Sequence, residues 1–407
     1  MGRWNRATAR WFYRIRTVAS TPLRGSRQDG HCGGTDLNGA DRHGGNLEAT
    51  ALRLGCRPDQ LLDASASLAP FPLPWRARLA LSRAALQPYP DRHSQRLRGC
   101  IAALHGLDPE AVLPGNGAAE LFTWAARDAA VEGCSLLPQP GFADYSRALR
   151  CWGGAVAAMA VPLRWTGLGP DAFPLTGAPE APVLWITNPH NPTGQLWSRA
   201  SLAPLLARFA LVICDEAFLP LVPNGEAQSL IPLLADHRNL VVIRSLTKLY
   251  GIAGLRLGYA VGEPERLQRW ASWRDPWPVN AVASAVAQEL LASPMRHHAW
   301  MQRVQRWTAR EGAWLQGQLS ALPGITPMPS SANYLLIRGE HDGRPLSLQP
   351  LREALESRHR VLLRDCRSFE GLDESWLRIG FQSRLGNRRI IRAMRQELSA
   401  INSSASN

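Results

Sequence analysis

The chain has 407 residues, of which 45% are hydrophobic, and a formal net charge of +13 at pH 7. This length accommodates two or three domain-sized units with a large buried core, and no apolar run reaches the roughly 20 residues that a membrane-spanning helix needs. The charge does not indicate nucleic-acid binding, because residues 1–35 supply +6 of it and the other +7 is spread along the chain without basic runs. The preference for arginine over lysine, or an anionic, phosphorylated substrate, explains the positive charge as well as nucleic-acid binding would.

The seven cysteines are scattered singly, with no CxxC pair and no metal-ligand spacing. An odd number of isolated cysteines is typical of reduced thiols in a cytosolic protein. The sequence therefore predicts a cytoplasmic protein without a metal site.

Residues 1–40 are rich in tryptophan and arginine and show no periodicity. We expect a disordered or loosely docked N-terminal extension. Arginine-rich, acid-poor starts also occur in organelle transit peptides, and a misassigned start codon is an equal alternative. No chemistry is expected from this segment.

His43 begins the part that we expect to fold. Residues 46–55 predict a short amphipathic helix stopped by a glycine, and a proline-rich extended segment follows the LLDASAS stretch. Two further helices are expected at about 75–86 and 92–105, with Asp91 as the N-cap of the second.

From about residue 112 to residue 262, apolar strand patterns alternate with helical patterns. This alternation predicts an α/β fold with a mainly parallel sheet covered by helices on both faces. The expected helices are 117–130, 142–151 and 198–209, and the expected strands are 135–138, 154–161, 183–187, 210–214, 240–245 and 256–262.

Helices at about 281–292 and 296–320 lead out of this region. The last part predicts strands at 332–337, 361–364 and 375–381 and helices at 350–359 and 387–400, an α+β pattern that suits a smaller domain. We therefore expect an extension at 1–40, an arm with part of the small domain at 41–90, a large domain at 91–295 and a small domain at 296–407.

Lys248 is the only lysine among the 46 basic residues, and it lies in a polar turn between two apolar strand patterns. A lysine amine can lose its proton and form a Schiff base with an aldehyde, whereas an arginine guanidinium stays protonated. The alternative is a surface lysine that survived by chance. The strand-turn context favours a chemical role.

Pyridoxal phosphate requires such a lysine, a carboxylate for its pyridine nitrogen, donors for its phosphate and a flat group on its ring. Asp215 follows the apolar run ALVIC, at the end of a strand where open α/β sheets place ligand contacts. The loop NPHNPTG leaves Asn191 able to donate a hydrogen bond. The turn GNGAAE opens a helix, whose N-terminal amides suit a phosphate. Each signal alone also fits an ordinary turn or strand end, but the four together favour a cofactor site.

GNGAAE, the PGF at 140–142, NPHNPTG, DEAF at 215–218 and SLTKLYGIAGLRLGY resemble the fold-type I pyridoxal-phosphate enzymes of the class I/II aminotransferase family. Within that family the chain is similar to the threonine-phosphate decarboxylase branch of cobalamin biosynthesis, which is related to histidinol-phosphate aminotransferase. HGGN at 43–46, PYPD at 88–91, PWPVNA at 277–282, ANYLLIR at 332–338 and the RDC…F…GL pattern at 364–372 carry this closer resemblance. It extends from about His43 to the C-terminus.

The resemblance implies roles for individual residues. Lys248 and Asp215 would be catalytic, as the Schiff-base lysine and the partner of the pyridine nitrogen. The other cofactor contacts would be Gly117, Ala118, Phe142, Asn191, Ser245, Arg256 and, from the neighbouring subunit of a homodimer, Tyr89. The substrate contacts would be Arg378 for a carboxylate, Arg364 for a phosphate, and His43. Phe142 could otherwise be an ordinary core residue and each arginine an ordinary surface charge.

Four positions depart from a typical pattern. Many aminotransferases have tyrosine at the position of Phe218, whereas the decarboxylase branch has phenylalanine there, as this chain does. Ser67 and Ala69 replace two asparagines of that branch, and Gln382 replaces a frequent arginine. These last three positions are expected near the substrate.

The expected activity is decarboxylation of L-threonine O-3-phosphate to 1-aminopropan-2-yl phosphate. An aminotransferase, for instance on histidinol phosphate, has the same cofactor contacts and is the alternative. A regulator that kept the fold without turnover is a third interpretation, but about 40 N-terminal residues are too few for a DNA-binding domain.

Overall fold

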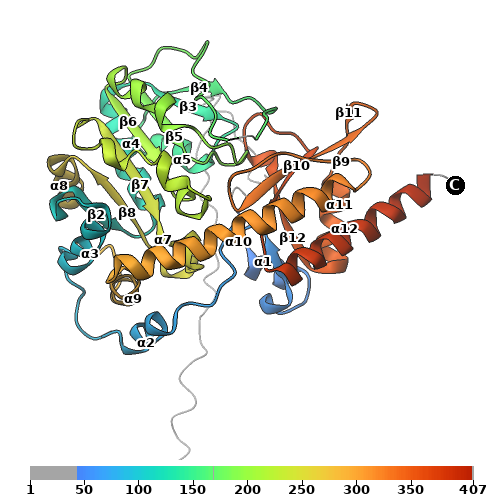
Figure 1. Ribbon diagram of the computed structural model, residues 1–407, viewed down its shortest axis with the longest axis horizontal. Helices are drawn as coiled ribbons and strands as arrows, with labels where there is room; N and C mark the ends of the chain where they lie inside the picture. Colours follow the sequence, from blue (N-terminus) through green and yellow to red (C-terminus); the bar gives the residue numbers. More distant parts are fainter. Residues whose placement is uncertain (1–43, 168, 406–407) are drawn as a thin grey trace, which may run out of the picture. The chain divides into compact units, whose positions relative to one another are not determined.

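The computed structural model describes residues 44–167 and 169–405 (Figure 1). The predicted extension at 1–40 and the predicted substrate contact His43 lie outside the described residues. The described residues belong to one compact unit. Within the described residues, every helix is too short or too polar to span a lipid bilayer.

A seven-stranded sheet forms the centre of the fold, in the order β2-β8-β7-β6-β5-β3-β4. Its pairs are parallel except that β8 runs antiparallel to both β2 and β7. This confirms the predicted mainly parallel α/β sheet. The strands are β2 (Val112–Gly115), β3 (Ser135–Gln139), β4 (Val156–Ala160), β5 (Val183–Thr187), β6 (Leu211–Asp215), β7 (Leu240–Ser245) and β8 (Gly258–Gly262).

Successive side chains of a strand point to opposite faces of a sheet. Buried side chains on both faces of this sheet pack against helices, so both faces are covered. On β6, Leu211 and Ile213 pack with α4 (Ala118–Glu132), α5 (Ala143–Cys151) and α8 (Pro264–Trp273). Val212 and Cys214 join the core on the other face. The helices that contribute to that second core include α3 (Gln95–His105), α6 (Arg199–Leu202) and α9 (Ala281–Leu291).

A second sheet follows the order β1-β12-β13-β10-β11, with β9 paired to β10. Only β1 and β12 pair in parallel in this sheet. Strand β1 lies at its edge, so a segment from the N-terminal part of the chain completes a sheet made mostly of C-terminal strands. The strands are β1 (Leu62–Ala64), β9 (Ile325–Pro327), β10 (Tyr334–His341), β11 (Arg344–Pro345), β12 (Val361–Asp365) and β13 (Trp376–Gly380), and the neighbouring helices are α11 (Gln349–His359) and α12 (Arg384–Ala405).

The 27-residue helix α10 (Pro294–Ser320) connects the two sheets along the chain. It contacts α9 and η4 (Leu219–Leu221) near the first sheet, and β9 and α12 near the second (Figure 1). The remaining elements are α1 (Leu47–Arg53), α2 (Trp75–Arg83), α7 (Leu246–Tyr250) and the short 3₁₀ turns Pro58–Gln60, Pro109–Ala111, Ala203–Ala207, Gly225–Gln228, Ile231–Leu233, Ala253–Leu255 and Cys366–Ser368. The predicted domain boundaries at 90 and 295 remain a prediction.

Two local predictions were wrong. The helix expected at 198–209 is α-helical only to Leu202 and continues as a 3₁₀ turn, because Pro204 cannot donate the hydrogen bond that an α-helix needs. Ser94, not Asp91, is the N-cap of α3. The Asp91 carboxylate still accepts hydrogen bonds from the amides of His93 at 3.0 Å and Gln95 at 2.7 Å, so it stabilises the turn before the helix.

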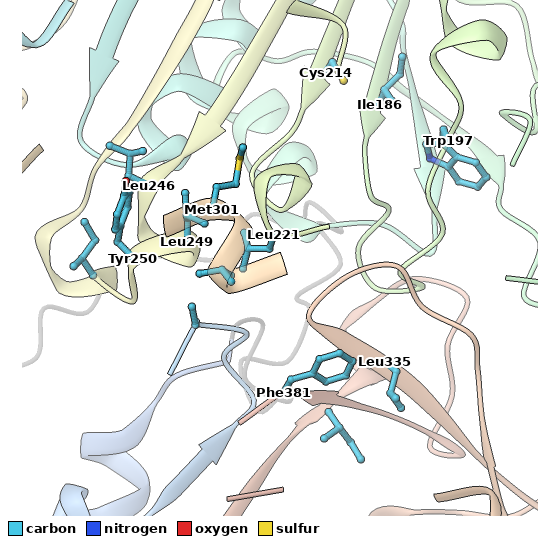
Figure 2. Packing of buried hydrophobic residues seen from close by; sticks show 14 of the residues in the cluster. Ile186, Trp197, Cys214, Leu221, Leu246, Leu249, Tyr250, Met301, Leu335 and Phe381 are labelled. Atoms are coloured by element: carbon cyan, nitrogen blue, oxygen red, sulfur yellow. The ribbon is translucent and has the colours of Figure 1, made fainter. Parts of the chain in front are cut away.

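The short helix α7 is held by the hydrophobic core on one side. Leu246, Leu249 and Tyr250 are buried, and Figure 2 shows them beside Met301 of α10. Positions i, i+3 and i+4 of a helix share one face. Lys248 therefore lies on a different face of α7 from these three residues.

Candidate active site

A cavity of about 190 Å³ lies where β5, β6 and β7 end, and residues of the second sheet close it. Ten of the predicted site residues line it: Gly117, Ala118, Phe142, Asn191, Asp215, Ser245, Lys248, Arg256, Arg364 and Arg378. A larger cavity of about 430 Å³ elsewhere has no charged side chain among the described residues of its lining. The gathering of ionisable groups, and not volume, identifies the smaller cavity as the candidate site.

Backbone contacts on several sides fix the position of Lys248. Its carbonyl oxygen accepts a hydrogen bond from the amide of Ala69 at 3.0 Å, and that of Leu249 accepts one from Trp300 Nε1 at 3.0 Å. Lys248 Nζ lies 5.5 Å from the ring centroid of Phe218. Burial, helped by the charges of nearby arginines, lowers the pKa of Lys248 to about 8. A larger fraction of the amine is therefore neutral and nucleophilic at physiological pH than in an exposed lysine.

Asp215 ends β6, and both of its carboxylate oxygens accept hydrogen bonds. Oδ2 accepts from Tyr145 Oη at 2.5 Å, and Oδ1 accepts from the amide of Ala217 at 2.9 Å. Burial raises the pKa of Asp215 to about 6, although these two bonds and the charge of Lys248 oppose that rise. The group is thus mostly a carboxylate at neutral pH and can hold a cationic ring nitrogen.

The N-terminus of α4 forms an anion cradle with the turn after β7. Gly117 is the N-cap of α4 and has a φ of 79°, and a Cβ atom there would lie 2.6 Å from Arg256 Nη2. The Ser245 and Thr247 hydroxyls lie 2.7 Å apart in the same cavity. Helix amides, two hydroxyls and a guanidinium are the donor set that a phosphate requires. These residues fit the phosphate of pyridoxal phosphate.

Arg378 of β13 is buried at the wall of the cavity. Its Nη1 donates to Asn191 Oδ1 at 2.5 Å and its Nη2 donates to the carbonyl of Ser65 at 3.1 Å, while Nε has no hydrogen-bond partner among the described residues. Because Asn191 Oδ1 is already an acceptor, its amide nitrogen is the atom left to donate to a ligand.

Arg364 of β12 lies directly opposite Arg378 in the antiparallel register. It is also buried, and its Nη2 donates to Ser368 Oγ at 2.6 Å. Paired positions on neighbouring strands place side chains on the same face of a sheet. Two guanidinium groups therefore face one small cavity, which predicts a ligand with more than one anionic group.

Two of the three positions expected near the substrate do not line the cavity. The amide of Gln382 donates to the carbonyls of Asp63 at 3.0 Å and Gly380 at 3.3 Å, so it braces the backbone. Ala69 is buried and bonds α7 through its own amide. Ser67 does line the cavity, and its hydroxyl is buried without a hydrogen-bond partner among the described residues.

Tyr89 also lies outside this cavity. Its side chain is 78% exposed and stacks on Trp277 with 4.3 Å between ring centroids. Its predicted contact with the site of a neighbouring subunit stays a prediction.

The sequence interpretation gave no role to Tyr145, Thr187 or Thr247. Thr247 lies between Ser245 and Lys248, so its position next to the cofactor lysine was an available signal. Tyr145 and Thr187 lie in separate segments, and only the folded sheet brings them to Asp215.

The chain matches the family model for aminotransferase class I and II over residues 62–394. It is 34% identical to the threonine-phosphate decarboxylase of Salmonella typhimurium (strain LT2) over 373 residues, which cover 88% of this chain and 97% of that protein. It is 33% identical to the histidinol-phosphate aminotransferase of Symbiobacterium thermophilum over 330 residues, which cover 79% of this chain and 86% of that protein.

Solved structures show the same fold. The L-threonine-O-3-phosphate decarboxylase of Porphyromonas gingivalis superposes with a TM-score of 0.70 at 26% identity, covering 83% of this chain and 100% of that one. The histidinol-phosphate aminotransferase of Sinorhizobium meliloti, in complex with pyridoxal-5'-phosphate, superposes with a TM-score of 0.74 at 21% identity, covering 88% and 95%. The family match, which spans most of the chain, and the arrangement of Lys248 and Asp215 agree: the chain belongs to the aminotransferase class I and II family.

Proposed function

We propose that this protein is a pyridoxal-phosphate-dependent decarboxylase that converts L-threonine O-3-phosphate to 1-aminopropan-2-yl phosphate in cobalamin biosynthesis. The observation that carries the proposal is the pair Arg364 and Arg378 facing the cavity that also holds Lys248 and Asp215. Threonine phosphate is an amino acid with two anionic groups to bind beyond its amine, a carboxylate and a phosphate. The similarity to threonine-phosphate decarboxylases supports it.

The residues of the site fit the cofactor group by group. Ser245, Thr247, Arg256 and the first amides of α4 would hold its phosphate, and Phe142 would lie against its ring. Asn191 would donate to its phenolic oxygen. When bound, pyridoxal phosphate supplies an electron sink that stabilises negative charge on the substrate carbon.

The protein's own part in the reaction is to orient and to move protons. Arg378 would hold the substrate carboxylate by its planar fork, and Arg364 would hold the phosphate. Binding energy from the phosphate can then be used to enforce the orientation in which the carboxylate leaves. Lys248 Nζ, with a pKa of about 8, can carry a proton to the substrate carbon after CO2 is lost. Ser67 Oγ supplies a further donor at the wall of the cavity.

An aminotransferase acting on histidinol phosphate is the second candidate. Relatives with that name cover a large share of the chain, and the cofactor contacts would be the same. A transaminase acting on histidinol phosphate needs to bind a phosphate but no carboxylate in that substrate. The 2-oxoglutarate partner of such a transaminase does carry carboxylates, so Arg378 fits both candidates. The similarity to the threonine-phosphate decarboxylase, which extends over 88% of the chain, is what favours the decarboxylase.

The proposal includes a cytoplasmic homodimer with shared active sites. Tyr89 would reach the cofactor phosphate of the neighbouring subunit, and His43 would contact the substrate. The exposed aromatic pair Tyr89 and Trp277 supports an interface, because tyrosine and tryptophan are enriched in protein–protein interfaces. The cysteines of the described residues are free thiols, which supports a reducing compartment.

Product analysis tests the proposal. The purified protein with pyridoxal phosphate should release one CO2 and form one 1-aminopropan-2-yl phosphate for each threonine O-phosphate consumed. Conversion of histidinol phosphate with 2-oxoglutarate, without CO2 release from threonine phosphate, would instead establish the aminotransferase.

A further inference from the structure

A buried chain of hydroxyl groups lies behind Asp215, and the roles proposed above do not use it. Tyr145 Oη donates to Asp215 Oδ2 at 2.5 Å and lies 2.9 Å from Thr187 Oγ1. All three side chains are buried. Because a phenol has one proton and Tyr145 gives it to the carboxylate, the Thr187 hydroxyl donates to Tyr145 Oη. The hydrogen bonds therefore run in one direction, from Thr187 through Tyr145 to Asp215.

The surrounding packing holds this chain of hydroxyls in place. Thr187 and Asp215 are paired in register at the ends of the neighbouring strands β5 and β6. The Tyr145 ring contacts Phe122 edge-on at 5.0 Å between centroids and Trp185 at 5.1 Å. A ring packed between aromatic neighbours has little freedom to turn its hydroxyl to another acceptor. The hydrogen bond to Asp215 is thus fixed before any ligand binds.

We propose that Tyr145 is a positioning residue that keeps the Asp215 carboxylate ionised and aimed at the pyridine nitrogen of the cofactor, with Thr187 strengthening its hydrogen bond. The inference rests on the proposed function, namely on Asp215 as the partner of that nitrogen. A hydrogen bond to the charged form of an acid favours that form. Successive hydrogen bonds in a low-dielectric interior reinforce one another.

The electrostatic surroundings explain why one donor matters. Burial raises the pKa of Asp215 to about 6, and Glu216 contributes to the rise, whereas Tyr145, the Ala217 amide and Lys248 oppose it. Burial also raises the pKa of Cys214 and of Tyr334, so these two neighbours stay neutral near pH 7. Without the tyrosine hydroxyl, the Asp215 pKa would move toward neutrality and the carboxylate would be partly protonated.

The substitution Tyr145→Phe keeps the packed ring and removes the donor. The affinity of the apo protein for pyridoxal phosphate can be measured by quenching of tryptophan fluorescence over a range of pH. We expect the pH below which affinity falls to move up by about one unit, as for the loss of one hydrogen bond to a charged group. Affinity should then fall about twofold at pH 7 and about tenfold at pH 5, where the ionised fraction of Asp215 is limiting. Tyr259→Phe is the matched control, because this buried tyrosine bonds His105 at 2.8 Å and not Asp215. It should leave the pH profile unchanged.

The same substitution in an Asp215→Asn background separates positioning from folding. An amide side chain at position 215 carries no charge that a hydrogen bond could stabilise. Adding Tyr145→Phe in this background should therefore change the affinity for pyridoxal phosphate, and its pH profile, little further. Equal losses in both backgrounds would show a structural role and overturn the inference. Wild-type affinity and pH profile in Tyr145→Phe, with a loss in Asp215→Asn, would overturn it while leaving the Asp215 assignment intact. No loss in Asp215→Asn would remove the assignment itself.

Thr187→Val provides the test if Tyr145→Phe does not fold. It removes the donor to Tyr145 Oη and leaves the phenol in place. We expect a smaller shift of the affinity profile in the same direction, to higher pH. A profile that stays at its wild-type position would contradict the proposed chain of hydrogen bonds.

Discussion

Arg364→Ala should selectively remove recognition of the substrate phosphate. Arg364 is 4% exposed and faces a cavity of about 190 Å³, so bulk water contributes little screening to a bond made there. A charge-assisted hydrogen bond of this kind contributes about 1.5–3 kcal/mol. At about 1.4 kcal/mol for each factor of ten, kcat/KM for threonine O-phosphate should fall by roughly 10- to 150-fold.

The assay compares threonine O-phosphate with free threonine in wild-type and variant protein, following CO2 release. Threonine lacks the group that Arg364 would bind, so its kcat/KM should change little and the gap between the two substrates should narrow. Arg367→Ala is the matched control, because Arg367 lies three residues away and bonds the Asp365 carboxylate at 2.7 Å, outside the cavity. An equal loss for both substrates, with an unchanged melting temperature, would refute Arg364 as the phosphate residue.

Three further predictions concern the cofactor site. Asp215→Ala should lower turnover by several orders of magnitude, because the electron sink loses its charged partner, while circular dichroism shows a folded protein; near-normal turnover would exclude Asp215 from that role. A mixture of inactive Tyr89→Ala and Lys248→Ala chains should regain partial activity, because one hybrid site receives both intact residues; no recovery after verified subunit exchange would place each site within one chain. In the apo protein, acylation of Lys248 followed by peptide mapping should be half-maximal near pH 8, since burial lowers its pKa from 10.5, and a midpoint near the ordinary value would contradict that environment.

The sequence predicted the parts of the site that depend on backbone chemistry. Glycine at 117 is needed where φ is positive and where a guanidinium approaches closely, so the GNGAAE turn was informative in combination with the other signals. Asp215 and Lys248 could be placed because strand ends and the turns after them are recognisable from apolar runs. The resemblance to the family supplied most of the other site residues, and ten of the predicted residues line one cavity.

Contacts between residues far apart in the sequence could not be predicted by such local rules. Tyr145 reaches Asp215 across 70 positions of sequence, and nothing local distinguishes it from an ordinary core tyrosine. Gln382 was expected near the substrate, but its amide instead bonds two backbone carbonyls, one of them 319 positions away. Both results depend on how strands of different segments pair, which a single sequence does not show.

The most direct test of the account uses the fact that Lys248 is the only lysine in the chain. The purified protein with pyridoxal phosphate is reduced with borohydride, and its intact mass and peptides are measured. We predict one phosphopyridoxyl group for each chain, located on the peptide that contains Lys248, and a yellow colour that disappears on reduction. A protein that gains no visible absorption band with pyridoxal phosphate, and no label on Lys248, would contradict the central claim.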